Sequence, residues 1–499
     1  MSDVKNGSLR TAGRHALIYG AAVLLQRAIS FVMLPVYTRF LTPSDYGVSQ
    51  LLDMTVDVAG ILLVAGTVTG LQRLYYAATE EGARNRVVST TFIGLMCQGL
   101  VGTASLWLLA PLIWRFGFSP AGSIGMIRLA AVNFTLSLLP AVPLLLLQIE
   151  RRSIPYVVAM LVKLVLQLSF NIVFVVSMRL GVWGVLLSTT IASAIVGAAL
   201  SAWCLRRTGV NFDVPVARLV GKFGAPYRSA AIGSFLLTFG DRFFLKAYYG
   251  VASVGLYALS YQFGFLLAQL GHIPVMSAWE PQRYILARES DEALRRDTTR
   301  GFLLYNVVML GVAVALGCGA RPMMHLLVGP DFWLAADVVP IVVAAYVFNN
   351  WFVVVKFGID LGGKTRPVAY ATWLSVLVTG GAYAWLIPPY GAAGAAWATL
   401  VGFIVRFAVL YPAAHRARPL PYGWANVGAL ATLAFGLMAV SVMVRPTSLV
   451  ADAIASIFEM CVFLVYAWLA ALMRDDRRAL VSMGSGLLRR MAGRTAATA

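Results

Sequence analysis

The sequence predicts an all-α integral membrane protein with about 14 transmembrane helices, arranged as two pseudo-symmetric six-helix lobes and two C-terminal helices. Three observations predict this fold class: the apolar composition, the uneven distribution of basic residues between loops, and an internal repeat. Hydrophobic residues make up 60% of the chain, and charged residues make up only 12%. A surface so poor in charge does not suit a protein surrounded by water. We therefore expect lipid to be the main solvent of the folded chain.

The apolar stretches are long enough to cross a bilayer. A helix needs about 20 consecutive apolar residues to span the hydrocarbon core. The sequence offers such stretches almost end to end, at residues 15–38, 47–72, 87–112, 123–148, 154–178, 183–205, 223–248, 254–280, 301–320, 337–361, 367–387, 392–412, 424–444 and 453–473. No small-residue cleavage site follows the first stretch, so we expect it to be retained as a helix.

Lysine and arginine are distributed unevenly between alternate loops. One set of loops holds 27 of these residues, and the other set holds five, which are Arg39, Arg115, Arg179, Arg321 and Arg445. Because cytoplasmic loops carry the basic excess, both termini are predicted to lie in the cytoplasm. This bias, together with attraction to anionic lipid headgroups, accounts for the net charge of +19. Nucleic acid is therefore not expected as a partner.

An internal repeat with an offset near 210 residues indicates a duplication. The corresponding segments are 40–47 with 248–255, 179–185 with 389–395, and Gln72-Arg73 with Gln282-Arg283. The alternative is that the shared glycines only mark tight turns, where glycine supplies positive φ angles. That alternative does not explain the common offset. Two similar helical bundles that rock about a central site are typical of alternating-access transporters.

The repeat also defines the predicted domains. They are an N-terminal lobe at 15–205, a C-terminal lobe at 223–412, two additional helices at 424–473 and a basic cytoplasmic tail at 474–499. The connections between spans are too short to hold a soluble catalytic domain. The four cysteines and four histidines are scattered without metal-ligand spacing. We therefore expect no enzymatic activity, no cofactor and no metal site.

Two stretches of the sequence resemble a known family. Residues 34–47, LPVYTRFLTPSDYG, and residues 386–399, LIPPYGAAGAAWAT, are similar to signature stretches of the polysaccharide-transporter flippases. That family belongs to a superfamily that also holds multidrug and toxin exporters and the lipid II flippase. The resemblance implies a V-shaped pair of six-helix lobes in a bacterial inner membrane. It further implies transfer of undecaprenyl-diphosphate-linked oligosaccharide from the cytoplasmic to the periplasmic leaflet, for polysaccharide biosynthesis.

The expected partners follow from this resemblance. They are the lipid-linked oligosaccharide, membrane lipids, and a polysaccharide polymerase with other envelope assembly proteins, and the protein is expected to be a monomer. Two alternatives stay open. The first is a multidrug exporter of the same fold, which predicts an acidic cavity. The second is an envelope glycosyltransferase, polymerase or ligase, which predicts essential carboxylates or histidines in an outer loop.

Basic residues inside the spans are candidate substrate contacts. A charge at mid-bilayer costs about 2.5–3.5 kcal/mol on insertion scales, so a retained charge usually faces a cavity or a partner. A diphosphate is an anion that the arginine fork matches. We predict that Arg27, Arg242, Arg128 and Lys163 bind the substrate, with a local contact to Asp241 as the alternative for Arg242. The other basic residues in the spans are expected to snorkel to the headgroups; they are Arg228, Lys246, Lys356 and Arg406.

Acidic residues inside the spans are candidates for coupling. Gln50, Asp53 and Asp57 are three and four residues apart and share one face of the second span. Two carboxylates one turn apart raise each other's proton affinity, which suits coupling to protons or a cation. A salt bridge to Arg27 is the alternative. Asp241 is the third predicted coupling residue.

Residues 358–365, GIDLGGKT, match the phosphate-loop pattern letter for letter. A phosphate loop follows a buried strand and opens a soluble helix, whereas this segment joins two predicted spans. We therefore expect no nucleotide site. Lys356 and Asp360, at the start of the segment, are four residues apart and are expected to form an ion pair.

Overall fold

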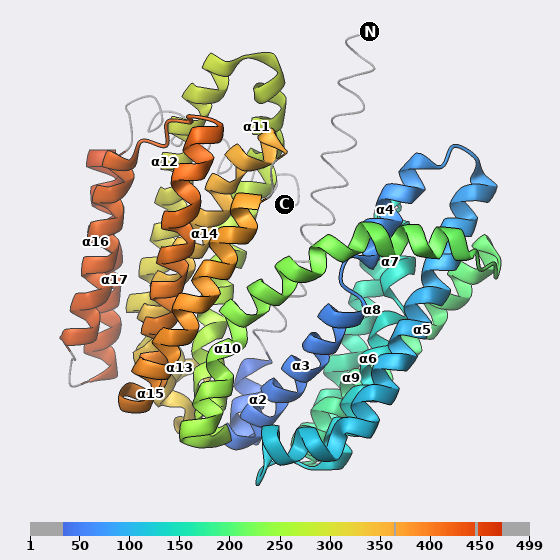
Figure 1. The fold of residues 1–499 in the computed structure, drawn as a ribbon. Helices are drawn as coiled ribbons and strands as arrows, with labels where there is room; N and C mark the ends of the chain where they lie inside the picture. The colour runs from blue at the N-terminus through green and yellow to red at the C-terminus, as the bar shows by residue number, and fades with distance from the viewer. Residues whose placement is uncertain (1–32, 364–365, 445–447, 472–499) are drawn as a thin grey trace, which may run out of the picture. The chain divides into compact units, whose positions relative to one another are not determined.

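The computed structural model describes residues 33–363, 366–444 and 448–471, and within these ranges the chain is entirely helical apart from short turns (Figure 1). The α-helices are α2 (Leu34–Phe40), α3 (Pro43–Leu63), α4 (Thr67–Ala77), α5 (Glu81–Ile113), α6 (Ile124–Leu138), α7 (Ala141–Ile149), α8 (Ser153–Asn171), α9 (Val182–Thr208), α10 (Val214–Leu267), α11 (Ile273–Glu289), α12 (Asp291–Cys318), α13 (Ala320–Leu327), α14 (Val339–Gly362), α15 (Arg366–Ala417), α16 (Trp424–Met443) and α17 (Leu449–Tyr466). Short π-helical segments extend several of them, and a 3₁₀ helix, η4 (Pro330–Val338), precedes α14.

The described residues contain 11 helical segments that are long and apolar enough to cross a membrane. Two of these segments, Arg228–Glu289 and Arg366–Ala417, each overlap two of the predicted spans. The helices α10 and α15 turn within these segments, at Gly250 and Gly391. The predicted fold class is therefore confirmed. The count of fourteen stays a prediction, because most of the first span, 15–38, lies outside the described residues.

The backbone repeats the duplication seen in the sequence. Gly181, before α9, has φ 57° and ψ −131°. Gly391, which is 210 residues later, has φ 55° and ψ −128°. A side chain is strained at such positive φ angles, so glycine is required at both turns. The same unusual conformation therefore recurs at the offset of the sequence repeat.

A second pair of repeat-related glycines permits a close approach of two helices. Gly47 in α3 and Gly255 in α10 are both buried, and neither has a positive φ angle. A Cβ atom on Gly255 would overlap the carbonyl oxygen of Pro43 and lie 2.9 Å from the nitrogen of Gly47. A Cβ atom on Gly47 would overlap the carbonyl oxygen of Val251. These two glycines are therefore needed for helix packing and not for a turn.

The helix α3 begins with a capping box. The Thr42 hydroxyl accepts a hydrogen bond from the Asp45 backbone at 3.2 Å, and the Asp45 carboxylate accepts one from the Thr42 backbone at 3.1 Å. Pro43 occupies the first turn, where its missing N–H costs nothing. This cap holds the start of α3, on which Gly47, Asp53 and Asp57 lie.

Replacing Thr42 with alanine is expected to destabilise the protein by about 1 kcal/mol, because the backbone N–H of Asp45 loses its acceptor at the cap. The melting temperature of the purified protein measures this change. Thr42→Ser keeps the hydroxyl and is the matched control. Equal melting temperatures of the alanine and serine variants would contradict a stabilising role of the cap.

Contacts divide the chain into two compact units, which we describe separately. The first comprises the chain up to Ser260, together with Leu327–Ala335 and Ala369–Val405. The second comprises Tyr261–Leu326, Ala336–Val368 and the chain from Arg406 onward. The predicted lobe boundaries of 15–205 and 223–412 therefore stay a prediction.

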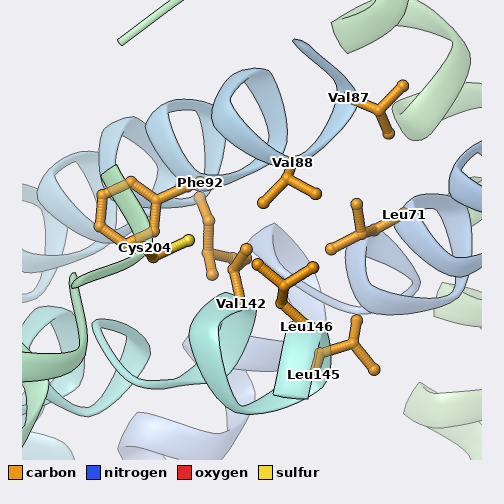
Figure 2. Packing of buried hydrophobic residues seen from close by; sticks show 9 residues of the cluster. Leu71, Val87, Val88, Phe92, Val142, Leu145, Leu146 and Cys204 are labelled. Atoms are coloured by element: carbon orange, nitrogen blue, oxygen red, sulfur yellow. The ribbon is translucent and has the colours of Figure 1, made fainter. Parts of the chain in front are cut away.

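Each unit has its own apolar core. In the first unit, α4, α5, α7 and α9 meet in one cluster, and Figure 2 shows Val88 and Phe92 of α5 facing Val142 and Leu146 of α7. In the second unit, aromatic rings form an extended network of edge-to-face and stacked pairs; its members include Phe302, Trp351, Phe407, Tyr411, Tyr422 and Trp424. Such pairs contribute about 0.5–1.5 kcal/mol each beyond the area they bury.

Candidate functional site

The first unit contains a cavity of about 670 Å³ between α3, α6 and α10. Its wall is mostly apolar, and its polar side chains are Asp57, Ser137, Ser234 and Thr238. A cavity of this size and composition is in the range of ligand pockets. Among the described residues that line it, Asp57 is the only charged one.

The predicted coupling residues Asp53 and Asp57 are exposed on one face of α3. Neither carboxylate forms a hydrogen bond or an ion pair with another residue of the described ranges. The Tyr37 hydroxyl interacts electrostatically with Asp53 and accepts a hydrogen bond of 2.7 Å from the Asn171 amide. Within the described residues, the structure thus places Asp53 near the Tyr37 hydroxyl of α2 and Asp57 at the cavity, and pairs neither with a basic side chain.

Arg242 and Asp241, predicted for substrate binding and coupling, are paired with each other. Their side chains are 1% and 0% exposed, and the shortest distance between guanidinium and carboxylate is 3.4 Å. The Asp241 carboxylate also accepts hydrogen bonds from the Tyr257 hydroxyl at 2.7 Å and from the Thr399 hydroxyl at 3.5 Å. This is the local contact that the sequence left open as the alternative for Arg242.

Arg242 lies one layer behind the cavity wall. Its guanidinium donates a hydrogen bond to the Thr238 carbonyl at 3.1 Å and lies 4.8 Å from the centre of the Phe239 ring. Both Thr238 and Phe239 line the cavity. A role of Arg242 or Asp241 in binding or coupling would require this pair to open, and it stays a prediction.

The other predicted substrate cations lie apart from the cavity or outside the described residues. The Arg128 guanidinium, half-buried in α6, lies 5.2 Å from the Trp107 ring centre. Lys163 is half-buried in α8, one turn before Gln167, whose amide donates to the Thr189 hydroxyl at 3.3 Å. Neither Arg128 nor Lys163 lines the cavity. Arg27 lies outside the described residues, so the structure does not place it.

Three of the other basic residues of the spans, Lys356, Lys246 and Arg406, form local contacts. The expected pair of Lys356 and Asp360 is confirmed, with 3.4 Å between nitrogen and oxygen. Lys246 donates a hydrogen bond of 2.8 Å to the Phe116 carbonyl. Arg406 lies 3.9 Å above the Phe352 ring. Glycines 358 and 362 of the phosphate-loop pattern belong to the last turns of α14, and Lys364 and Thr365 lie outside the described residues.

The sequence did not single out Arg283, which is fully buried in the second unit. Its guanidinium lies 3.9 Å from the Phe357 ring centre and 4.6 Å from that of Trp279. It donates to the Val354 carbonyl at 3.4 Å and the Tyr422 hydroxyl at 3.5 Å. Burial raises the pKa of Tyr422, which lies outside the spans, so this hydroxyl stays neutral. The repeat match between Gln72-Arg73 and Gln282-Arg283 was the available signal.

The sequence also did not single out Asp452 and Glu459, which are buried on α17. Their spacing of seven residues in an otherwise apolar helix was the signal that could have found them. Among the described residues, no group of three or more histidine, cysteine, aspartate or glutamate side chains is arranged to hold a metal ion.

The fold is similar to that of solved transporters. The lipid II flippase MurJ in an inward closed conformation matches 91% of this chain and 99% of its own, at 12% identity and a TM-score of 0.69. An inward-facing multidrug resistance MATE family transporter of the MOP superfamily covers 80% of this chain and 97% of its own, at 13% identity and a TM-score of 0.64. A MOP superfamily transporter from Pyrococcus furiosus, described with a binding pocket of reversed polarity, covers 80% of this chain and 94% of its own, at 14% identity and a TM-score of 0.56.

These likenesses show the fold, and a family model shows the family. No curated protein sequence matches the chain significantly. The model of the family described as "Polysaccharide biosynthesis protein" matches residues 36–340, which is more than half of the chain. The matched range begins in the stretch LPVYTRFLTPSDYG and continues to the start of α14. The chain therefore belongs to the polysaccharide biosynthesis protein family.

Proposed function

We propose that the protein is a flippase that moves undecaprenyl-diphosphate-linked oligosaccharide repeat units from the cytoplasmic to the periplasmic leaflet. The observation that carries the proposal is the family membership of a chain whose all-helical fold extends over 99% of a lipid II flippase. Moving a lipid-linked sugar between leaflets requires two alternately open states. A duplicated helical fold provides these, because its halves can rock about a central site.

The proposed mechanism gives charged side chains two tasks, which are binding of the substrate and coupling to an ion. We assign the anionic diphosphate to Arg27, Arg128 and Lys163, and coupling to Asp53 and Asp57. With both termini in the cytoplasm of a bacterial inner membrane, the substrate moves toward the positive side. An uncompensated anion gains about 2.3 kcal/mol per charge per 100 mV in this direction. The membrane potential would therefore assist export.

A deletion strain tests the function directly. We expect it to accumulate lipid-linked repeat units in the cytoplasmic leaflet, and expression of the chain should restore their appearance in the outer leaflet. If completed units instead reach the outer leaflet and stay unpolymerised, the protein acts after flipping, as a polymerase or ligase would.

The coupling carboxylates give a separate prediction. In proteoliposomes with a labelled lipid-linked oligosaccharide, a pH gradient is expected to accelerate flipping by the unmodified protein. Asp53→Asn and Asp57→Asn should lose this acceleration, because an amide cannot exchange a proton. They should keep most of the flipping seen without a gradient.

Asp331→Asn is the matched control for these variants, because Asp331 is exposed in η4 and lies outside the α3 face. It should respond to the gradient like the unmodified protein. An unchanged gradient response in both the Asp53 and Asp57 variants would contradict coupling through α3.

Export of organic cations is a second candidate function. The observation that favours it is Asp57, the charged side chain at the described cavity, because a carboxylate in an apolar pocket suits a cationic ligand. Cells expressing the chain would then resist cationic dyes, and Asp57→Asn would abolish the resistance. Resistance without any flipping of lipid-linked oligosaccharide would select this function over the first.

A further inference from the structure

The helix α17 exposes most of its surface and buries its acidic residues. Its buried residues are Asp452, Glu459 and Phe463. They are seven and four residues apart and therefore share one face. Asp452 and Glu459 are the acidic residues of this helix, whose composition is otherwise apolar. A helix that only packed against its neighbours would place apolar side chains on this face, so the two carboxyl groups require an explanation.

Glu459 lies deep in the helix and has no described cationic partner. It is 7% exposed, and its Oε2 atom is buried without a hydrogen-bond partner. The helix packs against α12, α16 and η5 (Ala467–Ala471), of which α16 and η5 carry no ionisable side chain. The titratable groups that interact with Glu459 are Cys318 at the end of α12, whose thiol donates a hydrogen bond to the carboxyl group, and Asp452 on α17 itself. An ionised carboxylate in such surroundings is costly.

Polar groups lead from the start of α17 toward Glu459. Asp452 lies in the first turn, and the Ser456 hydroxyl donates to its carbonyl at 2.9 Å. The same hydroxyl donates to the Cys318 carbonyl at 2.8 Å, which also accepts from Ser441 of α16 at 3.5 Å. Glu459 lies seven residues beyond Asp452, which corresponds to about 10 Å along the helix. Hydroxyl groups, backbone carbonyls and the Asp452 carboxyl group thus lie along the path from the start of α17 toward Glu459.

We propose that Glu459 is a proton-binding site, loaded along Asp452 and Ser456 from the side of the membrane where α17 begins. The alternation of basic loops places that side outside the cytoplasm. A proton taken from water binds to the unpartnered Oε2 atom, and the neutral acid then packs against α12. Release of the proton leaves a charged carboxylate, which is unfavourable in these apolar surroundings. The site lies in the C-terminal helices, apart from the cavity that contains Asp57, and it does not depend on the identity of the transported substrate.

Carbodiimide labelling tests the site on the full-length protein without a transport assay. Dicyclohexylcarbodiimide reacts with protonated carboxyl groups in apolar surroundings, and peptide mass spectrometry locates the product. We expect labelling of Glu459 in the unmodified protein, with at least about tenfold more product at pH 6 than at pH 9. Glu280, an exposed glutamate of α11, is the matched control and should stay unlabelled. Absence of labelling at Glu459, or labelling that is the same at both pH values, would overturn the proposal.

Two variants extend the test. Glu459→Gln has nearly the shape of the protonated acid, so it should keep its melting temperature while the infrared band of a buried carboxylic acid disappears. Asp452→Asn should slow the labelling of Glu459 severalfold without removing it. Labelling at the unmodified rate in Asp452→Asn would refute the route through Asp452. Persistence of the infrared band in Glu459→Gln would show that another carboxyl group binds the proton.

Discussion

Gly255→Ala is expected to prevent stable packing of α3 against α10 in the first unit. The added methyl group would overlap the backbone of Pro43, and the three atoms nearest to it are all backbone atoms, which no change of a side-chain rotamer can move. Overpacking of a core costs about 1–3 kcal/mol when side chains absorb it, and more is expected where backbone meets backbone. The melting temperature and the fraction of monodisperse protein after extraction measure the loss.

Gly380→Ala is the matched control for this substitution. Gly380 lies inside α15, and a Cβ atom there would have no heavy atom within 4 Å. Alanine is the better helix former by up to about 1 kcal/mol, so this variant should be as stable as the unmodified protein or more so. If Gly255→Ala and Gly380→Ala melt alike, the close approach of α3 and α10 is not required.

The second large effect is expected at the buried pair of Asp241 and Arg242. Replacing either partner alone, by Asp241→Asn or Arg242→Met, removes the oppositely charged neighbour of the other at a site that is almost fully buried. Such a loss costs about 3–5 kcal/mol. The double variant removes both charges and should recover most of the stability, which a double-mutant cycle of melting temperatures would show.

Flipping by the double variant separates structure from substrate binding. Because Arg242 lies behind Thr238 and Phe239, we expect the folded double variant to flip the substrate at a rate near that of the unmodified protein. A double variant that is stable but inactive would show that Arg242 contacts the substrate after the pair opens. Arg242→Lys would then be expected to restore activity only in part, since lysine lacks the planar fork.

The fold could be predicted from the sequence because its determinants are spread over many residues. The apolar stretches, the bias of basic loops and the offset of the repeat each combine dozens of positions, so an error in one does not change the result. The glycines show what the sequence could not predict, which is the structural role of each repeated residue. The repeat identified Gly47 and Gly255, as well as Gly181 and Gly391, yet only the structure shows that the first pair permits contact and the second permits a turn.

The candidate site was predictable only in part, because the orientation of a side chain depends on its neighbours. Asp53 and Asp57 share a face by helical geometry alone, and the structure exposes both. Arg242 was predicted to bind the substrate or to contact Asp241, and in the structure its side chain reaches back to Asp241 and to the carbonyl of Thr238, which the residue spacing does not reveal. Arg283 falls outside the predicted spans, because the span 254–280 ends before it, whereas α11 continues to Glu289.

The contact between Gly47 and Gly255 is symmetric in a specific sense. Gly47 meets Val251, and Gly255 meets Pro43. Pro43 and Val251 are separated by 208 residues, as are Gly47 and Gly255. At this contact, residues 43–47 and 251–255 therefore present the same surface to each other, as the two partners of an isologous interface do. A single half of this chain, paired with a copy of itself about a two-fold axis, would form the same contact twice.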